Sequence, residues 1–209
     1  MNNMFSTINT RRSIRKYCSD PVSDEQTEAL INAAAAAPSG CNSQCWYFAC
    51  VKSREMIDGL ALATQKGVER FYKDCGDDAF LSSRIRQTTF FRNAPLVICV
   101  YKTIMNYHDP RVTRFYEQNG YDHDTMLDML GSPDILSVGA AIENMLLAAH
   151  DMGLGGCWMN DPVVAQAEIN EFIGIPEGYR LMSIVPIGKP AYTPRQKVMK
   201  PVSEICRII

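Results

Sequence analysis

One unbroken apolar run constrains the fold of this 209-residue chain more than any other feature: Leu96-Val97-Ile98-Cys99-Val100-Tyr101. A short run of this kind, without polar alternation, is typical of a central strand buried on both faces. Further strand patterns occur at 46–51, 154–159 and 181–187, and helical patterns fill most of the chain between them. We therefore predict an α+β fold in which a small central sheet is surrounded by helices.

The clearest helical pattern begins at Ser132 and ends at Gly153. Ser132 is a suitable N-cap, Pro133 suits the first helical position, and Gly153 is a common stop. Between them, apolar residues recur with a period of 3.6 residues: Ile135, Val138, Ala141, Ile142, Met145, Leu146 and Ala149.

A second well-marked helix is expected to start at Ser23, where Gln26 three residues later completes a capping box. Alanines dominate its second half, and Pro38 ends it. The remaining helical patterns cover 4–12, 54–69, 70–92 and 163–173.

Residues 104–131 differ from the rest of the chain because they are polar and lack a clear period. A connection of this length in a compact domain is often functional, so we interpret it as an insertion or a lid. The tail, 189–209, is expected to be extended, and it carries Arg195, Lys197 and Lys200.

The bulk composition is that of an ordinary globular domain, with 46% apolar and 21% charged residues. Neither a repeat nor a low-complexity linker divides the chain, so 1–209 is expected to form one domain. The sequence pI of about 5.9 argues against nucleic acid as a partner. No apolar run is long enough to cross a membrane, and the N-terminus does not resemble a signal peptide. A cytoplasmic location is the expectation.

Cysteines and histidines offer no metal-binding pattern. The eight cysteines include no Cys-x-x-Cys pair, and the three histidines lack ligand spacing, so no metal site is expected. Disulfides would be unusual in a cytoplasmic domain. Cys50, Cys99 and Cys157 lie in apolar stretches and are expected to be buried.

The strongest candidate for binding is a basic cluster formed by Arg11, Arg12, Arg15 and Lys16, with Ser13 among them. It is a local anomaly, because the whole chain has a formal net charge of -2. Guanidinium groups match phosphate oxygens in a bidentate manner, which favours a phosphate site. A solvated basic face on an N-terminal helix is the alternative.

The chain lacks the common nucleotide and hydrolase motifs. We find no Walker A motif, no Gly-x-Gly-x-x-Gly after a strand and no Gly-x-Ser-x-Gly elbow. Phosphate-binding groups without an obvious acid, base or nucleophile suggest a cofactor that brings its own reactivity.

Several motifs in a fixed order resemble the FMN-dependent nitroreductase family. They are Arg11-Arg12-Ser13-Ile14-Arg15, Pro38-Ser39-Gly40-Cys41-Asn42-Ser43-Gln44-Cys45-Trp46, Gly139-Ala140-Ala141-Ile142-Glu143-Asn144, Gly153-Leu154-Gly155-Gly156-Cys157-Trp158, and Val185-Pro186-Ile187-Gly188-Lys189-Pro190. The resemblance implies an α+β sandwich with a small, mainly antiparallel sheet. It also implies an intertwined homodimer with two FMN sites at the subunit interface.

The resemblance further assigns cofactor contacts near the N-terminus and in the first turn. Arg11 and Ser13 would hold the phosphate and the ribityl chain, with Arg12 nearby. Arg15 would lie at the N1–C2 edge of the flavin, where a fixed cation raises the reduction potential. The turn formed by Pro38, Ser39, Gly40 and Asn42 would cover the cofactor from the other subunit.

Later segments would complete the cofactor site. Gln87 would face the flavin pyrimidine, and the backbone at Met159 and Asn160 would approach N5. The family has a phosphate cation two residues before a tail proline, but here Met199 occupies that position. Lys197 is the preferred replacement, with Arg195 and Lys200 as alternatives.

The implied function is an FMN-dependent NAD(P)H oxidoreductase with a ping-pong mechanism. NAD(P)H would deliver a hydride to N5, and a nitroaromatic, a quinone or a similar electron-poor acceptor would take it. The protein need not supply a titrating base. Two alternatives are a flavin-binding or thiol redox-sensing module without turnover, and a flavoenzyme of the same fold that dehalogenates aromatics or fragments flavin.

Overall fold

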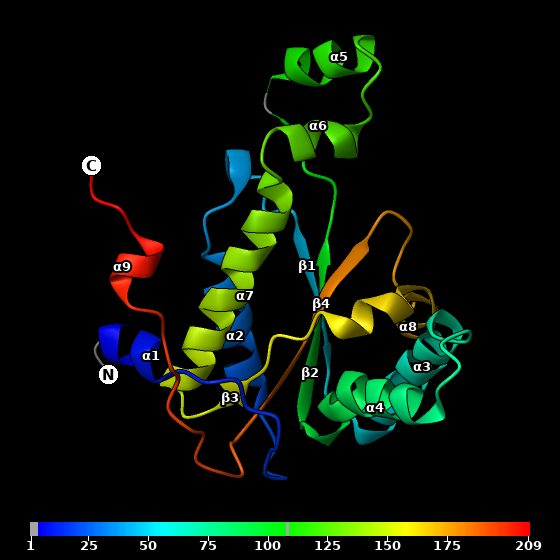
Figure 1. Cartoon of the computed structure of the whole chain (residues 1–209), viewed down its shortest axis with the longest axis vertical. Helices are drawn as coiled ribbons and strands as arrows, with labels where there is room; N and C mark the ends of the chain where they lie inside the picture. The colour runs from blue at the N-terminus through cyan, green and yellow to red at the C-terminus, as the bar shows by residue number, and fades with distance from the viewer. Residues whose placement is uncertain (1–3, 108) are drawn as a thin grey trace.

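The computed structural model describes residues 4–107 and 109–209 and confirms the α+β fold (Figure 1). Its sheet contains β1 (Trp46–Val51), β2 (Leu96–Lys102), β3 (Gly155–Gly156) and β4 (Arg180–Gly188), in the order β1-β2-β4-β3. All three pairs of neighbouring strands are antiparallel. The predicted strand at 154–159 is shorter than expected, although Met159 forms an isolated bridge with Ile184 of β4.

The apolar run that forms β2 lies at the centre of the molecule, and successive residues face opposite layers. Leu96, Ile98 and Val100 pack in a cluster with α2 (Asp24–Ala35) and α7 (Pro133–Asp151). Val97, Cys99 and Tyr101 pack in a second cluster on the other face. Helices α3 (Arg54–Phe71), α4 (Asp78–Thr89) and α8 (Gln166–Ile173) lie on this second side.

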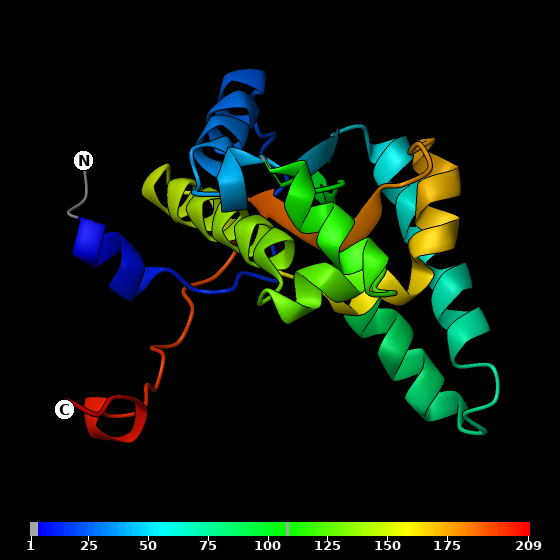
Figure 2. The same ribbon diagram turned by 90° about the horizontal axis from the view of Figure 1, so that it is seen from above.

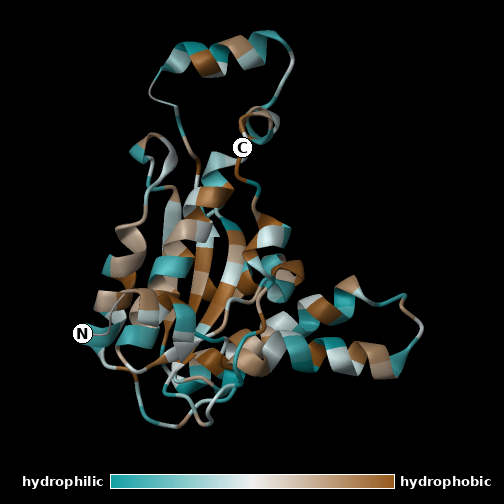
Figure 3. Cartoon of the chain, turned by 60° about the vertical axis from the view of Figure 1, so that its left-hand side comes forward, coloured by the Kyte–Doolittle hydropathy of each residue, from teal (hydrophilic) through white to brown (hydrophobic). Residues whose placement is uncertain are grey.

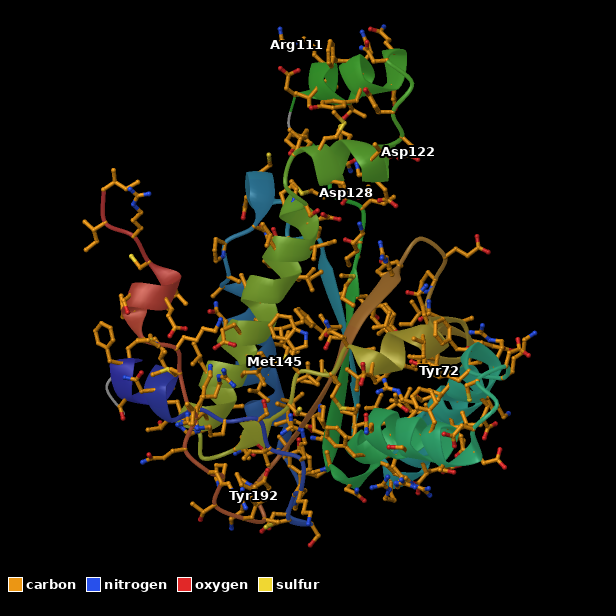
Figure 4. The ribbon with its side chains drawn as sticks, viewed as in Figure 1. Tyr72, Arg111, Asp122, Asp128, Met145 and Tyr192 are labelled. Atoms are coloured by element: carbon orange, nitrogen blue, oxygen red, sulfur yellow. The ribbon has the colours of Figure 1, made fainter. Side chains whose placement is uncertain are left out.

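Figure 3 shows the apolar strands enclosed between the helical layers, with teal residues toward the outside. In the view with side chains, Met145 of α7 lies on the first side of the sheet and Tyr72, just after α3, lies on the second (Figure 4). Every residue of β2 from Leu96 to Tyr101 is buried. Because both faces of the strand are covered, its sequence is continuously apolar and does not alternate between polar and apolar residues.

The start of α2 follows the predicted capping chemistry, but the start of α7 does not. Ser23 accepts a hydrogen bond from the Gln26 backbone, and the Gln26 side chain bonds back to Ser23. Ser132 adopts the left-handed region, with φ of 52°, and makes no side-chain cap to α7. Its hydroxyl instead donates to Asp128 Oδ1 at 3.0 Å. The helix end is as predicted, with Gly153 at φ of 74°.

The predicted insertion at 104–131 is more ordered than its polar sequence suggested. It forms α5 (Pro110–Gln118) and α6 (His123–Met129), which project beyond the sheet at the top of Figure 1. Their start signals are aspartates, since Asp109 and Asp122 cap the two helices through their side chains. His108 lies outside the described residues.

The two ends of the chain lie on the same side of the body and extend away from it (Figure 2). Helix α1 (Met4–Thr10) ends before Arg11, so the basic cluster follows the helix instead of lying at its C-terminal end. The tail is extended as predicted, except for the short helix α9 (Val202–Ile205). Three 3-10 turns complete the elements: η1 (Gly40–Asn42), η2 (Phe90–Asn93) and η3 (Asp161–Ala165).

All eight cysteines are free thiols. Cys99 and Cys157 are buried as predicted, but Cys50 is exposed on the edge strand β1. Across residues 4–107 and 109–209, we find no cluster of His, Cys, Asp and Glu side chains that could hold a metal ion. None of the helices in these ranges is long and apolar enough to cross a bilayer.

One ion pair ties α3 to α8 and leads to a prediction for stability. Arg70 binds Glu168 through two hydrogen bonds, of 2.6 and 3.2 Å, and these bonds lower the pKa of the Glu168 carboxyl. Glu168→Gln should therefore cost less than about 1 kcal/mol of unfolding free energy at neutral pH. The difference from the wild type should vanish as the pH falls through the lowered pKa, because the stabilisation exists only above it. Urea denaturation at several pH values tests this, with Glu171→Gln as the control.

Candidate cofactor site

The basic segment is held against the sheet immediately after α1. The Ile14 amide donates to the Gly156 carbonyl at 2.9 Å, and Ser13 forms a parallel bridge with Gly156. The Tyr17 hydroxyl donates to the Ile14 carbonyl, and the Pro186 carbonyl lies 3.2 Å from the same oxygen and can share its hydrogen. Burial raises the pKa of this phenol, so it remains a donor at any physiological pH. The backbone of the segment is thereby fixed from both ends.

Two glycines of β3 make this close approach feasible. A Cβ atom at Gly155 would lie 2.4 Å from Ile14 Cγ1, and one at Gly156 would lie 2.7 Å from Ile187 Cδ1. Ile14 fills the space above Gly155 and is itself buried. Because alternate residues of an extended segment point in opposite directions, Ser13 and Arg15 are free to point away from this contact.

The smaller of two neighbouring cavities has the donor set of a phosphate site. Its volume is about 370 Å³, and no carboxylate lines it. Cationic and hydroxyl side chains dominate the wall: Arg11, Arg12, Ser13, Arg15, Tyr192, Arg195 and Lys197, together with Pro194. Figure 4 shows Tyr192 in the loop below the sheet, next to the N-terminal segment.

The cations of this cavity are not equally available to a ligand. Arg12 donates to the carbonyls of Asn9, Arg11 and Arg195, so it braces the end of α1 against the tail. Arg11 Nε lies 3.3 Å from Glu143 of α7, but its buried N–H is not aimed at the carboxylate and has no hydrogen-bond acceptor among the described residues. Both tail candidates Arg195 and Lys197 line the cavity, whereas Lys200 does not.

The larger cavity, of about 710 Å³, lies beside the first, and Arg15 borders both. It brings together four of the predicted site residues, Arg15, Gln87, Met159 and Asn160. The other lining residues come from the basic segment, from α4 and its end, and from the loop after β3: Lys16, Arg86, Phe90, Cys157, Trp158 and Asp161. Lys16, the last cation of the basic cluster, is exposed and borders this larger cavity but not the smaller one.

Within the larger cavity, the backbone of Met159 is already engaged. Its N–H donates to the Ile184 carbonyl at 3.0 Å, and its carbonyl accepts from both Ile184 and Ser183. A hydrogen bond from this stretch to a ligand must therefore come from Asn160. Its amide N–H has no acceptor in the described part of the chain, and its side chain is exposed.

Gln87 is held by its own helix. Its Oε1 accepts from Arg84 at 2.9 Å, and its Nε2 donates to Ser83 at 3.2 Å. Arg84 also pairs with Asp161 at 3.0 Å and lies over the Tyr72 ring. The network fixes the amide at the cavity wall and still leaves one N–H and one lone pair free for a ligand.

The predicted turn at 38–42 lies far from both cavities within one chain. The Gly40 amide donates to Ser137 near the start of α7. Arg11 of the basic segment pairs with Glu143 in the middle of α7, and Thr10, just before the segment, contacts His150 near its end. These contacts lie six and thirteen helical residues beyond Ser137, or about 9 and 20 Å along the helix axis, and none of residues 38–42 lines either cavity. Pro38, Ser39, Gly40 and Asn42 therefore do not join the other predicted residues in one subunit.

Sequence reasoning missed several cavity residues, although one had a readable signal. Phe90 follows Arg86 by four positions and Gln87 by three, which is the spacing of residues on one face of a helix. The prediction of Gln87 therefore pointed to Phe90 as well. Asp161 and Tyr192 had no such signal, because their placement depends on packing between distant segments.

Comparison with known proteins agrees with the predicted family and fold. The nitroreductase family model matches residues 8–189, and the chain belongs to the nitroreductase family. A Vibrio harveyi protein named NADPH-flavin oxidoreductase is 28% identical over 201 residues, covering 96% of this chain and 71% of that protein.

Solved structures give the same answer for the fold. A BluB-like flavoprotein from Clostridium difficile 630 superposes with a TM-score of 0.84 at 28% identity, over all of both chains. A nitroreductase with bound FMN from Bacteroides fragilis superposes with a TM-score of 0.72 at 22% identity, also over both whole chains.

Proposed function

We propose that this chain binds FMN and is an FMN-dependent NAD(P)H oxidoreductase. The observation that carries the proposal is Arg15, which borders both a cavity lined with cationic and hydroxyl side chains and a larger cavity beside it. A phosphate monoester joined to a ring system would suit two such cavities that share a wall residue. Family membership and the flavin-linked relatives support the same cofactor.

Different residues would bind the phosphate and the ring system of the cofactor. Arg11, Ser13, Arg195 and Lys197 would hold the phosphate, since charged donors make the strongest hydrogen bonds to it. Arg15 would lie at the edge of the ring, where negative charge develops on reduction.

The larger cavity would bind the ring system. Gln87 would bind the ring through its free amide N–H and its free oxygen lone pair. The Asn160 N–H, in the loop after β3, would donate to the ring. When bound, FMN would supply the hydride chemistry, which explains why no acid, base or nucleophile is needed from the chain.

A homodimer would complete the site. The turn at 38–42 lines neither cavity of its own subunit, so it would cover a cofactor in a partner subunit. Exposed apolar side chains on α1 and in the tail support such an interface: Met4 and Ile8, then Val198, Met199, Val202, Ile205, Ile208 and Ile209. Large apolar patches of this kind are typical of contact surfaces. A monomer that retains FMN in light scattering would contradict this arrangement.

An anaerobic reductive titration tests the function. Protein with bound FMN should lose its yellow colour on addition of NADH or NADPH and regain it with a nitroaromatic or a quinone. Bound FMN that neither nicotinamide reduces would favour the non-catalytic module, and colourless protein that takes up no FMN would refute the proposal. Halogenated aromatics in the acceptor panel distinguish the dehalogenation alternative.

The thiol-sensing alternative has less support. Cys157 lines the larger cavity, but burial raises the pKa of its thiol, with partial relief from Arg15. Thiols with raised pKa values contain little thiolate at neutral pH, and the thiolate is the reactive form.

Arg15→Ala should lower the flavin reduction potential more than it weakens FMN binding. Loss of a hydrogen bond to a charged group costs about 1.5 kcal/mol or more, which corresponds to about 30 mV for a two-electron couple. Spectroelectrochemical titration measures the shift. Arg15→Lys should retain most of the potential, and Lys197→Ala should weaken binding without changing it. An unchanged potential in Arg15→Ala refutes the assigned role.

A further inference from the structure

His150, in the last turn of α7, contacts the end of α1 just before the basic segment. Its Nε2 lies 2.7 Å from the Thr10 hydroxyl oxygen, and the same hydroxyl lies 2.7 Å from the Ser6 carbonyl. A hydroxyl has one hydrogen, and a carbonyl can only accept. Thr10 therefore donates to Ser6, and His150 must donate its Nε2–H to Thr10.

This assignment leaves Nδ1 as the nitrogen that gains or loses a proton. Protonation at Nδ1 adds a positive charge to the ring without breaking the contact with Thr10. His150 can thus anchor the end of α1 in both of its charge states, and only its charge changes with pH.

The surroundings of the ring oppose that charge while the phosphate cavity holds no anion. Partial burial lowers the pKa of His150, and Arg11 and Arg12 lower it further, while Asp151 on the same helix acts in the opposite direction. Helix α1 carries no ionisable side chain between Met4 and Thr10, and β3 consists of two glycines. Asp24 and Glu25, in the acidic first turn of α2, are not among the groups that shift this pKa.

The two arginines that repel the proton also line the phosphate cavity. A phosphate dianion bound there would offset their charge and favour protonated His150. We propose that His150 is a positioning residue of the phosphate site, which holds α1 through Thr10 and takes up a proton when a phosphate monoester binds. This inference rests on the proposed binding of FMN and extends it to a residue that lines neither cavity.

NMR titration of the His150 ring in two flavin complexes provides the direct test. Protein loaded with FMN is compared with protein loaded with riboflavin, which has the same ring system but no phosphate, and the His150→Gln variant assigns the signal. The His150 pKa should be higher by about one unit in the FMN complex. Equal values in both complexes would overturn the proposal while leaving FMN binding, and hence the proposed function, intact.

A pH profile of affinity separates the charge of His150 from its anchoring contact. Glutamine can still donate an N–H to Thr10 but cannot gain a proton. The ratio of the FMN Kd values, His150→Gln over wild type, should be near one at pH 8 and rise to about ten at pH 5. Taking this ratio cancels the titration of the FMN phosphate itself.

Thr10→Val serves as the complementary variant, because it removes the anchor and keeps the imidazole. It should weaken FMN binding by a similar factor at every pH. A Kd ratio for His150→Gln that does not depend on pH would reduce His150 to a structural contact and overturn the proposal. Protein that takes up no FMN at all would overturn both this proposal and the proposed function.

Discussion

Gly155→Ala is expected to destabilise the fold by about 1–3 kcal/mol and to weaken FMN binding at least tenfold. The new methyl group would lie 2.4 Å from Ile14 Cγ1 and 2.9 Å from Ile14 Cβ. Both atoms are close to the backbone, so Ile14 cannot move aside without moving the chain. The displacement would carry Ser13 and Arg15 away from the cavities that they line. Urea denaturation and fluorescence quenching of FMN measure the two effects.

The neighbouring glycine provides a matched control. A Cβ at Gly156 would meet the terminal atoms Ile187 Cδ1 and Leu146 Cδ2, each at 2.7 Å. Ends of flexible side chains can rotate away, so Gly156→Ala should cost less stability and less affinity than Gly155→Ala. Equal losses in the two variants would show that the position of Ile14 does not determine the geometry of the basic segment.

A double variant tests the same contact from the other side. Ile14→Ala alone removes a buried side chain and should cost about 2–5 kcal/mol. In Ile14→Ala/Gly155→Ala, the clash with Cγ1 is gone, so the combined loss should be smaller than the sum of the two single losses. Strict additivity would contradict the proposed clash.

The features that could be predicted from sequence are those encoded by neighbouring residues. The β2 run, the period of α7 and the capping box at Ser23 each lie within a short window, and the structure confirms them. The helices at 110–118 and 123–129 were missed because their apolar faces are short. Their aspartate caps at Asp109 and Asp122 were the available local signal.

Contacts between distant segments could not be predicted in the same way. The pairing of Thr10 with His150 joins residues 140 positions apart, and neither sequence window contains information about the other. Ser132 shows a related limit, because its residue type favours an N-cap, yet the turn places it in the left-handed region. The motif order predicted the basic segment and four residues that line the larger cavity, whereas the separation of the turn at 38–42 from them depends on how distant segments pack.

Asp134→Ala is expected to cost about 3 kcal/mol of unfolding free energy. Asp134, in the first turn of α7, forms an ion pair with Lys102 at the end of β2, and both side chains are largely buried. Loss of one member of such a pair leaves the other charge without its partner in a poorly hydrated site. The first turn of a helix also favours a negative charge, so the substitution loses that contribution as well.

Asp124 provides the control on the same lysine. It lies 3.5 Å from Lys102, but its side chain is 72% exposed. Asp124→Ala should therefore cost less than about 1 kcal/mol. Urea denaturation of both variants measures the difference, and equal losses would show that burial of the Lys102–Asp134 pair does not determine its contribution.

Replacement of both partners distinguishes a buried charge from a packing defect. In Lys102→Met/Asp134→Leu neither charge remains, and apolar side chains fill similar volumes, so most of the stability should return.

Helix α6, β2 and the start of α7 meet at this pair, so Asp134→Ala should also increase hydrogen exchange in 104–131. The Gly40 contact to Ser137 lies in the same turn of α7. If the turn at 38–42 covers the cofactor of a partner subunit, Asp134→Ala should weaken FMN binding although it touches neither cavity, and the double variant should restore it.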